Sequence, residues 1–319
     1  RDPVDKSGLA QLTRGLMDLG AGGMDENEVA TRLADLGAHL SGGADTDRAG
    51  VGLRTLAEPA TRAAAFAVLR AVIAEPRFDA AVFERERART VAALRESLTR
   101  PETIASRAFW SALYGDHPYG RQPTAESLGR IALDDLRAFH AAHYTARSAV
   151  VSIVGALDRA EAEALAQQLT EALPAGEAPS PIPPPALPAA GEVRLPHPAA
   201  QAHVYLGLPA LQRGDPDFYA LMVGNYSLGG GGFVSRLMKE VRDRRGFAYS
   251  VYSFFAPMQV PGPFQIGLQT KREQAGEALQ VTRDVLARFL AEGPGEDELA
   301  AAKANIVGSF PLRLDSNRK

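Results

Sequence analysis

Apolar residues near the start of the chain recur every three or four positions, a spacing that predicts amphipathic helices. The first such helix carries Leu9, Leu12 and Leu16 on one face, and Ser7 stands where it can cap the helix. The other elements expected in the first half are a helix through Val29, a strand at Val51–Leu56, helices at 60–74 and 79–98, an apolar strand at Ala149–Val154 and a helix from Asp158 to about Leu169. The mixture predicts a domain of helices and strands.

The middle of the chain is dense in proline. Seven prolines fall between positions 174 and 188, where missing amide donors and fixed φ angles exclude helix and central strand. We therefore interpret residues 174–191 as a linker between a first domain, 1–173, and a second domain, 192–319. The second domain is expected to contain a strand at His203–Leu208, a helix after Asp215-Pro216, a glycine-rich turn, a helix ending near Arg242, a pair of strands and two further helices.

The two domains look like copies of one another. Asp2-Pro3 corresponds to Asp215-Pro216, and residues 52–55 correspond to residues 267–270, at a period of roughly 215 residues. A period of this length indicates a duplicated domain. The strand that opens the second copy has no counterpart in the first, and the second copy stops at the partner of about Glu102. We therefore expect parts of both copies to be missing and the intact protein to exceed about 400 residues.

Composition narrows the function classes. The 319 residues include 38 acidic and 35 basic side chains, so the chain lacks the basic excess that nucleic-acid binding requires. The absence of cysteine excludes thiolate metal sites and cysteine nucleophiles. No apolar run reaches the roughly 18 residues that a membrane span needs. We therefore expect neither a nucleic-acid partner nor a membrane span.

Five strings carry a resemblance to a known family. They are Ser7-Gly8-Leu9-Ala10, Phe83-Glu84-Arg85-Glu86-Arg87, His117-Pro118-Tyr119-Gly120, the stretch from Arg242 to Ser250, and Gly308-Ser309-Phe310-Pro311-Leu312. On these strings the whole chain resembles the pitrilysin or insulinase family of inverzincin metallopeptidases, in the bacterial branch related to the mitochondrial processing peptidase. The resemblance implies an α+β fold of two homologous domains, each a mainly antiparallel sheet packed with helices, which together form a half-clamshell.

The zinc motif of that family is degenerate in this chain. Active members carry H-x-x-E-H on the first helix, where two histidines bind zinc and the glutamate is the general base, and a later glutamate completes the ligand set. In the family register these positions are Gln11, Arg14 and Gly15, with Ala93 at the later one. The resemblance therefore implies that this chain binds no cofactor of its own and that a partner subunit carries the zinc.

A second family motif is retained. It pairs an arginine at a helix end with a tyrosine seven residues later on the next strand, here Arg242 and Tyr249. A guanidinium and a phenol can both donate hydrogen bonds to the oxyanion that forms when a peptide bond is attacked, or grip the peptide backbone beforehand. The alternative is a surface arginine and a tyrosine packed into a sheet. The string around the pair favours the catalytic interpretation.

The glycine run and the strand after it allow two interpretations each. Gly229, Gly230, Gly231 and Gly232 lack the Gly-Lys-Ser/Thr ending of a nucleotide loop, so they form either a structural turn or a loop that contacts substrate. The strand from Phe247 to Phe255 alternates two sets of residues, with Tyr249 and Val251 expected on the same face. It is either an edge strand that accepts an extended peptide or a strand within a core.

These features lead to one hypothesis and one alternative. The hypothesis is a non-catalytic, substrate-binding subunit of a heterodimeric zinc metalloendopeptidase that cleaves peptides in a closed chamber. A homologous H-x-x-E-H subunit would be its partner, and Arg242 and Tyr249 would act in trans. The alternative is a structural or peptide-binding subunit, like the core proteins of the respiratory cytochrome complex, with no role in catalysis. The resemblance favours the periplasm as the location of the protein. The cytoplasm is the alternative.

Overall fold

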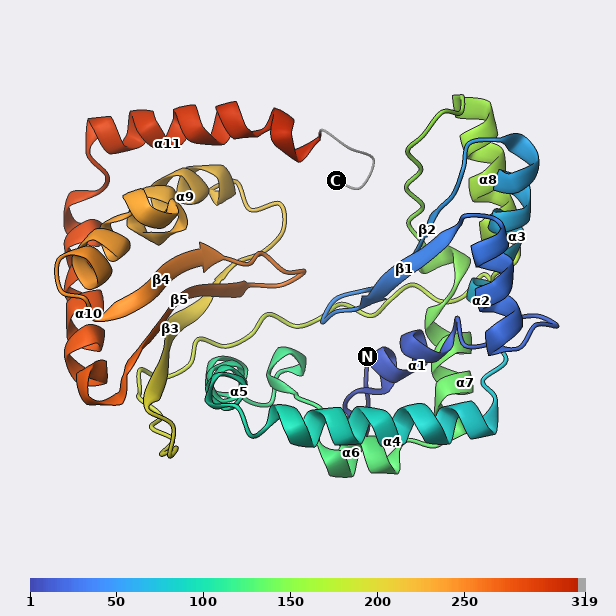
Figure 1. The fold of residues 1–319 in the computed structure, drawn as a ribbon, viewed down its shortest axis with the longest axis horizontal. Coiled ribbons are helices and arrows are strands. Elements are labelled where there is room, and N and C mark those ends of the chain that lie inside the picture. Colours follow the sequence, from blue (N-terminus) through green and yellow to red (C-terminus); the bar gives the residue numbers. More distant parts are fainter. Residues whose placement is uncertain (315–319) are drawn as a thin grey trace. The chain divides into compact units, whose positions relative to one another are not determined.

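The computed structural model describes residues 1–314, which divide into two compact units (Figure 1). The first unit contains residues 1–96 and 122–181, and the second contains residues 97–121 and the described residues from Ile182 onward. The division differs from the sequence-based boundary, because residues 97–121 belong to the second unit. The reason is apolar packing: Phe109 and Leu113 form one buried cluster with Val260.

The first unit is a helical layer around a two-stranded antiparallel sheet. Strands β1 (His39–Ala44) and β2 (Ala49–Arg54) pair from His39↔Arg54 to Ala44↔Ala49. The α-helices are α1 (Leu9–Leu16), α2 (Glu26–Asp35), α3 (Pro59–Ala74), α4 (Ala80–Ser97), α6 (Ala125–Arg130), α7 (Leu133–His143) and α8 (Arg159–Glu171). Short 3-10 turns are η1 (Val4–Lys6) and η3 (Ala146–Ser148). The apolar face of α1 is buried against α7 and α3, as its three-to-four-residue spacing predicts.

Two local expectations for the first unit were wrong. Ser7 does not cap α1: the Asp2 carboxylate accepts hydrogen bonds from the backbone N–H groups of Gly8 (2.6 Å) and Ala10 (2.8 Å) instead. The apolar run Ala149–Val154 forms no strand, and the side chains of Val150 and Val154 are 91% and 89% exposed. Strand formation needs a neighbour to pair with the backbone, and this run pairs with none of the described strands.

The second unit is built on a three-stranded antiparallel sheet in the order β3-β5-β4. Its strands are β3 (Gln201–Leu211), β4 (Ala248–Phe255) and β5 (Gly262–Lys271), and its α-helices are α5 (Pro101–Tyr114), α9 (Phe218–Asn225), α10 (Ala275–Glu292) and α11 (Glu296–Ser309). Short turns are the 3-10 segments η2 (Pro118–Gly120), η5 (Gly232–Val234), η7 (Arg272–Gln274) and η8 (Pro311–Arg313) and the π-helical turns η4 (Tyr226–Gly230) and η6 (Met238–Asp243). Because β4 pairs only with β5, it is an edge strand of this sheet.

One face of this sheet is covered by α10, and α5 covers part of the other. Helix α10 packs its Ala278 and Val285 with Ile266 on one face. On the other face the Phe109 ring of α5 lies so close to Gly207 that a Cβ there would come within 2.8 Å of Phe109 Cζ. This arrangement confirms the expected α+β fold with antiparallel sheets. The order helix, helix, strand pair, helix, helix occurs in both units, as a duplicated domain predicts.

No helix within residues 1–314 has the length and apolar character that crossing a bilayer requires.

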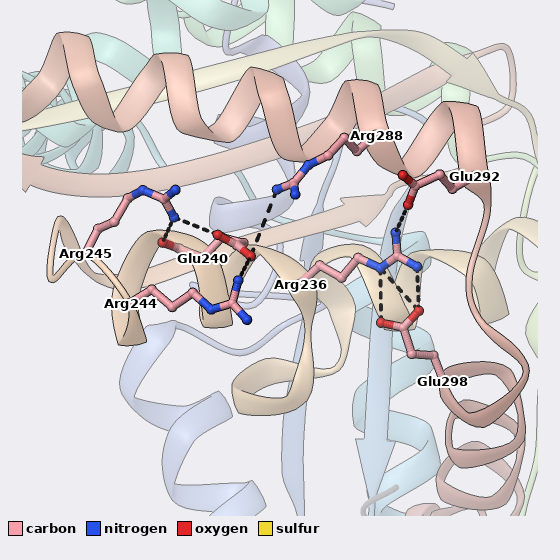
Figure 2. Close-up of polar contacts among 7 residues, drawn as sticks. All are labelled: Arg236, Glu240, Arg244, Arg245, Arg288, Glu292 and Glu298. Carbon is pink, nitrogen blue, oxygen red and sulfur yellow. Dashed lines mark hydrogen bonds and ion pairs between the residues drawn. The ribbon is translucent and has the colours of Figure 1, made fainter.

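Two ion-pair clusters fix the segment that leads into β4 (Figure 2). In the first, Arg236 donates to both carboxylate oxygens of Glu298 (3.0 and 2.7 Å) and to the Gly293 carbonyl (2.9 Å). In the second, the largely buried carboxylate of Glu240 accepts from Arg245 (2.6 Å) and Arg244 and lies 4.0 Å from Arg288 of α10. The two clusters tie the helical segment at 235–245 to α10 and to the start of α11.

The hydrogen bond from Arg245 lowers the pKa of Glu240 below its ordinary 4.5, against an opposing effect of burial, and the charges of Arg244 and Arg288 add to it. A lowered folded-state pKa means that the charged carboxylate stabilises the fold above pH 4.5 and that this contribution is lost as pH falls through the folded value.

We expect Glu240→Gln to lower the unfolding free energy of the second unit by about 1–3 kcal/mol at pH 7, because the arginines lose a charged acceptor. The difference from the wild type should shrink below pH 4.5, where the wild-type carboxylate also becomes neutral. Thermal unfolding by circular dichroism at pH 7 and pH 3.5 measures both. Glu292→Gln is the matched control, because its carboxylate is 65% exposed and 3.7 Å from Arg236. The control should change stability by less than about 0.5 kcal/mol. A pH-independent difference would contradict the assignment.

Candidate functional site

Arg242 and Tyr249, predicted as a pair from the sequence, lie side by side in the second unit. The guanidinium carbon of Arg242 lies 5.7 Å from the centre of the Tyr249 ring and 4.9 Å from the centre of the Phe233 ring. Both distances are within the range of cation–π attraction. Arg242 Nη1 also approaches the Asp243 carboxylate at 3.1 Å. The arginine is therefore held mainly by two aromatic rings and one neighbouring carboxylate.

A left-handed turn brings the two residues together. Gly246 adopts φ +63°, a conformation that glycine adopts at little cost. Its N–H donates to the Arg242 carbonyl (2.8 Å), and the Phe247 N–H donates to the Val241 carbonyl (2.9 Å). These bonds end the helical segment and direct the chain into β4. The residues from Arg242 to Tyr249 therefore form the end of a helical segment, a chain reversal at Gly246 and the start of strand β4.

A β-bulge turns Tyr249 outward. The pairing of β4 with β5 shifts register between Ala248 and Ser250, so Tyr249 is the extra residue, and its side chain is 85% exposed. Val251 and Ser253 instead point into the core. The expectation that Tyr249 and Val251 share a face was therefore wrong. Bulges are known to re-aim side chains beside functional sites, and this one presents the phenol to solvent.

The arginines of this string have different roles (Figure 2). Arg244 and Arg245 are committed to the Glu240 carboxylate, and Arg245 also donates to the Glu240 carbonyl at 2.9 Å. Only Arg242 faces Tyr249. The sequence has three arginines among the four charged residues 242–245. In the structure Arg242, the first of them, is the one that lies beside Tyr249.

Three of the four glycines pack too closely to carry side chains. A Cβ on Gly229 would lie 2.6 Å from the Ser253 backbone nitrogen, and one on Gly231 would lie 2.6 Å from the Tyr226 carbonyl oxygen. A Cβ on Gly230 would lie 2.7 Å from the side-chain nitrogen of Asn225. Gly232 has open space around it but adopts φ +58°. The geometry favours the structural-turn interpretation, and a direct substrate contact by these glycines stays a prediction.

The glycine run and β4 border an open pocket of about 430 Å³. Its lining consists of Gly229, Gly230, Gly232, Phe233, Met238 and residues 249–254. Tyr249 therefore stands at a cavity as well as beside Arg242. Sequence reasoning missed Phe233, which contacts Arg242 and lines the pocket. No periodic pattern marks it, and the one available signal was an aromatic residue directly after a glycine run.

The degenerate zinc positions lie in the first unit, where Arg14 is a structural crosslink. Its side chain is largely buried in α1, with Nε donating to the Gly50 carbonyl (2.8 Å) and Nη2 to the Ser41 carbonyl (2.9 Å). Nη1 pairs with Asp18 at 3.3 Å. The guanidinium therefore fastens α1 to β1 and β2. Burial of the Tyr144 phenol, near Arg14, raises its pKa to about 12, although the positive charge of Arg14 acts in the opposite direction.

The remaining positions of the zinc motif offer no metal ligands either. Gln11 and Gly15 are exposed on α1, and Ala93 is exposed on α4. Zinc prefers imidazole, thiolate and carboxylate ligands, whereas Arg14 carries the same charge sign as the metal. Within residues 1–314 no three histidine, aspartate or glutamate side chains are grouped as a metal site would require. The residues present do not fit the zinc ion of active members.

The fold and these sites together define the class of protein: a duplicated α+β protein with a degenerate metallopeptidase motif and an Arg/Tyr pair. The family model described as the peptidase M16 inactive domain matches residues 130–306, more than half of the chain. The chain therefore belongs to the peptidase M16 inactive-domain family, and the resemblance inferred from the sequence is confirmed.

Known relatives agree with this assignment. The chain is 33% identical over 216 residues to an uncharacterized zinc protease of Streptomyces coelicolor, covering 65% of this chain and 47% of the relative. It is 28% identical over 254 residues to the non-peptidase homolog YmxG of Helicobacter pylori, covering 78% of this chain and 58% of that protein. A crystal structure of a peptidase M16 inactive domain from Pseudomonas fluorescens superimposes with a TM-score of 0.92 at 39% identity, covering 95% of this chain and 74% of that one. The chain spans about half the length of the first of these relatives.

We expect Arg14→Met to lower the stability of the first unit by about 3 kcal/mol, because two carbonyl groups lose a charged donor. Thermal or urea unfolding measures the change. Arg48→Met, in the β1–β2 hairpin that Arg14 contacts, is the control, because the Arg48 side chain is 75% exposed and forms its ion pair with nearby Asp45. It should cost less than about 0.5 kcal/mol. Equal effects of the two substitutions would contradict the role of Arg14 in fastening α1 to the β1–β2 hairpin.

A pair of glycine substitutions tests the packing of the glycine run. Gly229→Ala should destabilise the chain by about 1–3 kcal/mol, because the new methyl group meets the Ser253 backbone. Gly15→Ala should stabilise it by about 0.5–1 kcal/mol, since Gly15 lies within α1 with nothing within 4 Å of the added carbon. Unfolding midpoints of the two variants measure the difference in sign, and a neutral Gly229→Ala would disprove the close packing.

Proposed function

We propose that this chain is the non-catalytic, substrate-binding subunit of a heterodimeric zinc metallopeptidase and that it supplies Arg242 and Tyr249 to peptides held at the partner's zinc site. One observation carries the proposal. The Arg/Tyr pair is assembled with the phenol of Tyr249 open to solvent, while the positions of the zinc motif are occupied by residues that do not suit zinc. A chain that keeps one half of a site and lacks the other is best explained by a partner that brings the missing half.

The chemistry of the pair suits peptide hydrolysis. Attack on a peptide carbonyl places negative charge on its oxygen, and a phenol O–H and a guanidinium N–H can both donate hydrogen bonds to that oxygen. The aromatic contacts to Phe233 and Tyr249 restrict the Arg242 side chain, so less conformational freedom is lost when it binds the oxygen. The same two donors can hold the peptide backbone before reaction.

The arrangement of subunits is part of this proposal. The partner is a homologous subunit with an intact H-x-x-E-H helix, and the two enclose a chamber that admits unfolded or small peptides. The proposed location is the periplasm. Activity would then depend on assembly, because neither subunit alone contains a full set of catalytic groups.

A peptide-binding role without catalysis is the second candidate. It is favoured by the similarity to the non-peptidase homolog YmxG. In that case Tyr249 would contact peptides but would not affect turnover.

The two candidates are separated by mixing this chain with an H-x-x-E-H homologue and measuring the cleavage of a fluorogenic peptide. We expect activity only in the mixture. Tyr249→Phe should lower kcat of the mixture about 100-fold, because it removes one oxyanion donor. Tyr219→Phe is the matched control, since Tyr219 is a similarly exposed tyrosine outside the pocket, and it should leave kcat unchanged.

Cleavage by this chain alone would contradict the proposal. A mixture whose kcat is insensitive to Tyr249→Phe would favour the peptide-binding candidate.

A further inference from the structure

A second pocket of the second unit lies where helix α5 meets strand β3, and it shares no lining residue with the pocket beside Tyr249. It is open and has a volume of about 470 Å³. Apolar packing holds the two elements together at this place: the Phe109 ring lies 5.8 Å from the Tyr205 ring, and Gly207 leaves room for Phe109 against the strand. The lining side chains are all polar: Arg100, Glu102, Thr103, Ser106, Arg107 and Tyr205.

Helical spacing brings two arginines to this pocket. Arg100 directly precedes α5, and Thr103 and Arg107 follow it at helical spacing, so that the three lie on one face. Burial lowers the pKa of Arg107 below its ordinary value, so its charge has lost part of its hydration. Among the described residues no acidic side chain pairs with Arg100. Because arginine is not deprotonated in proteins, two positive charges border one pocket.

Hydroxyl groups add neutral donors beside the arginines. Thr103, Ser106 and Tyr205 each bring one hydroxyl to the lining. Burial raises the pKa of Tyr205 to about 12, and the charges of Tyr252 and Glu102 act in the same direction, so the phenol keeps its proton at neutral pH. All of these donors are side chains, and they come from two elements that are distant in the sequence. They suit a ligand that accepts several hydrogen bonds at once.

The charges at the pocket select among anions. Two guanidinium groups and the one carboxylate of Glu102 leave a single net positive charge. A carboxylate carries one negative charge, and its two oxygens match the paired N–H groups of a guanidinium. A phosphate group carries about two negative charges at pH 7 and would face Glu102. The pocket therefore suits a carboxylate better than a phosphate.

Resting on the proposed peptide-binding function, we propose that this pocket binds the α-carboxylate at the free C-terminal end of a short peptide, through the guanidinium groups of Arg100 and Arg107. Every unmodified peptide has one such group whatever its sequence, so the site recognises an end rather than a side chain. Hydrolysis of a peptide bond also leaves a carboxylate on one of the two products. A volume of about 470 Å³ lies in the range of small-ligand pockets and leaves room for an end residue.

The test uses the chain of residues 1–319 without a partner subunit or zinc. A trifluoroacetylated peptide of three alanines is prepared with a free C-terminal carboxylate and as the C-terminal amide, and fluorine NMR titration gives each Kd. We expect the carboxylate peptide to bind about tenfold more tightly, because the amide loses charged hydrogen bonds to the arginines. Acetate should displace it at lower concentration than inorganic phosphate does. Stronger displacement by phosphate would contradict a carboxylate site.

Three variants locate the site. Arg100→Gln should weaken binding of the carboxylate peptide about tenfold and leave the amide peptide unchanged. Glu102→Gln should tighten binding about threefold, because it removes a like charge, and a gain in affinity cannot come from poor folding. Arg272→Gln is the matched control, since Arg272 is an exposed arginine of the same unit outside the pocket, and it should change neither Kd. Equal Kd values for the two peptides would overturn the inference, as would an unaltered preference in Arg100→Gln.

This outcome is separable from that of the proposed function. Equal Kd values for the carboxylate and amide peptides would remove this site and leave the effect of Tyr249→Phe on turnover intact. Conversely, a mixture with normal kcat in Tyr249→Phe leaves the measured preference for a free carboxylate intact. The two peptides are compared on the unaltered chain, so they decide the question even where a variant folds poorly.

Discussion

The candidate site depends on one largely buried carboxylate. Glu240 binds the side chains of Arg244 and Arg245, which follow it in the chain, and its carbonyl accepts a further bond from Arg245. These contacts fold the end of the helical segment back on itself, so that Gly246 reverses the chain at a defined point. Arg242 and Tyr249 lie on either side of that reversal. Their separation is therefore set by a structural ion-pair cluster that takes no part in the proposed chemistry.

Much of the architecture could be predicted from the sequence because it depends on local patterns. The spacing of Leu9, Leu12 and Leu16 correctly indicated α1, and the proline-rich stretch correctly indicated the absence of helix and strand there. The duplication was visible because corresponding strings survive in both copies. The pairing of Arg242 with Tyr249 followed from the family register, and the geometry places them in contact.

The features that sequence missed all depend on contacts between distant residues or on backbone register. The strand expected at Ala149–Val154 needs a neighbour, and apolar composition alone cannot supply one. The cap of α1 comes from Asp2, because the chain folds back over the helix start. The bulge at Tyr249 adds one residue to β4 and leaves the local pattern of apolar residues unchanged. Simple alternation therefore predicted the wrong face for this tyrosine.

The loss of the zinc motif is more than the removal of ligands. A metal ion in this motif would link the first helix to a later one, whereas Arg14 links α1 to the β1–β2 hairpin through two backbone carbonyls. Restoring the motif at Gln11, Arg14, Gly15 and Ala93 would therefore also remove the donor that these carbonyls need, and buried acceptors without donors are costly. The first unit has been rebuilt around a cation that belongs to the chain. The first helix of this chain is therefore held by its own guanidinium, and a zinc ion could bind there only if other donors replaced Arg14 at the two carbonyl groups.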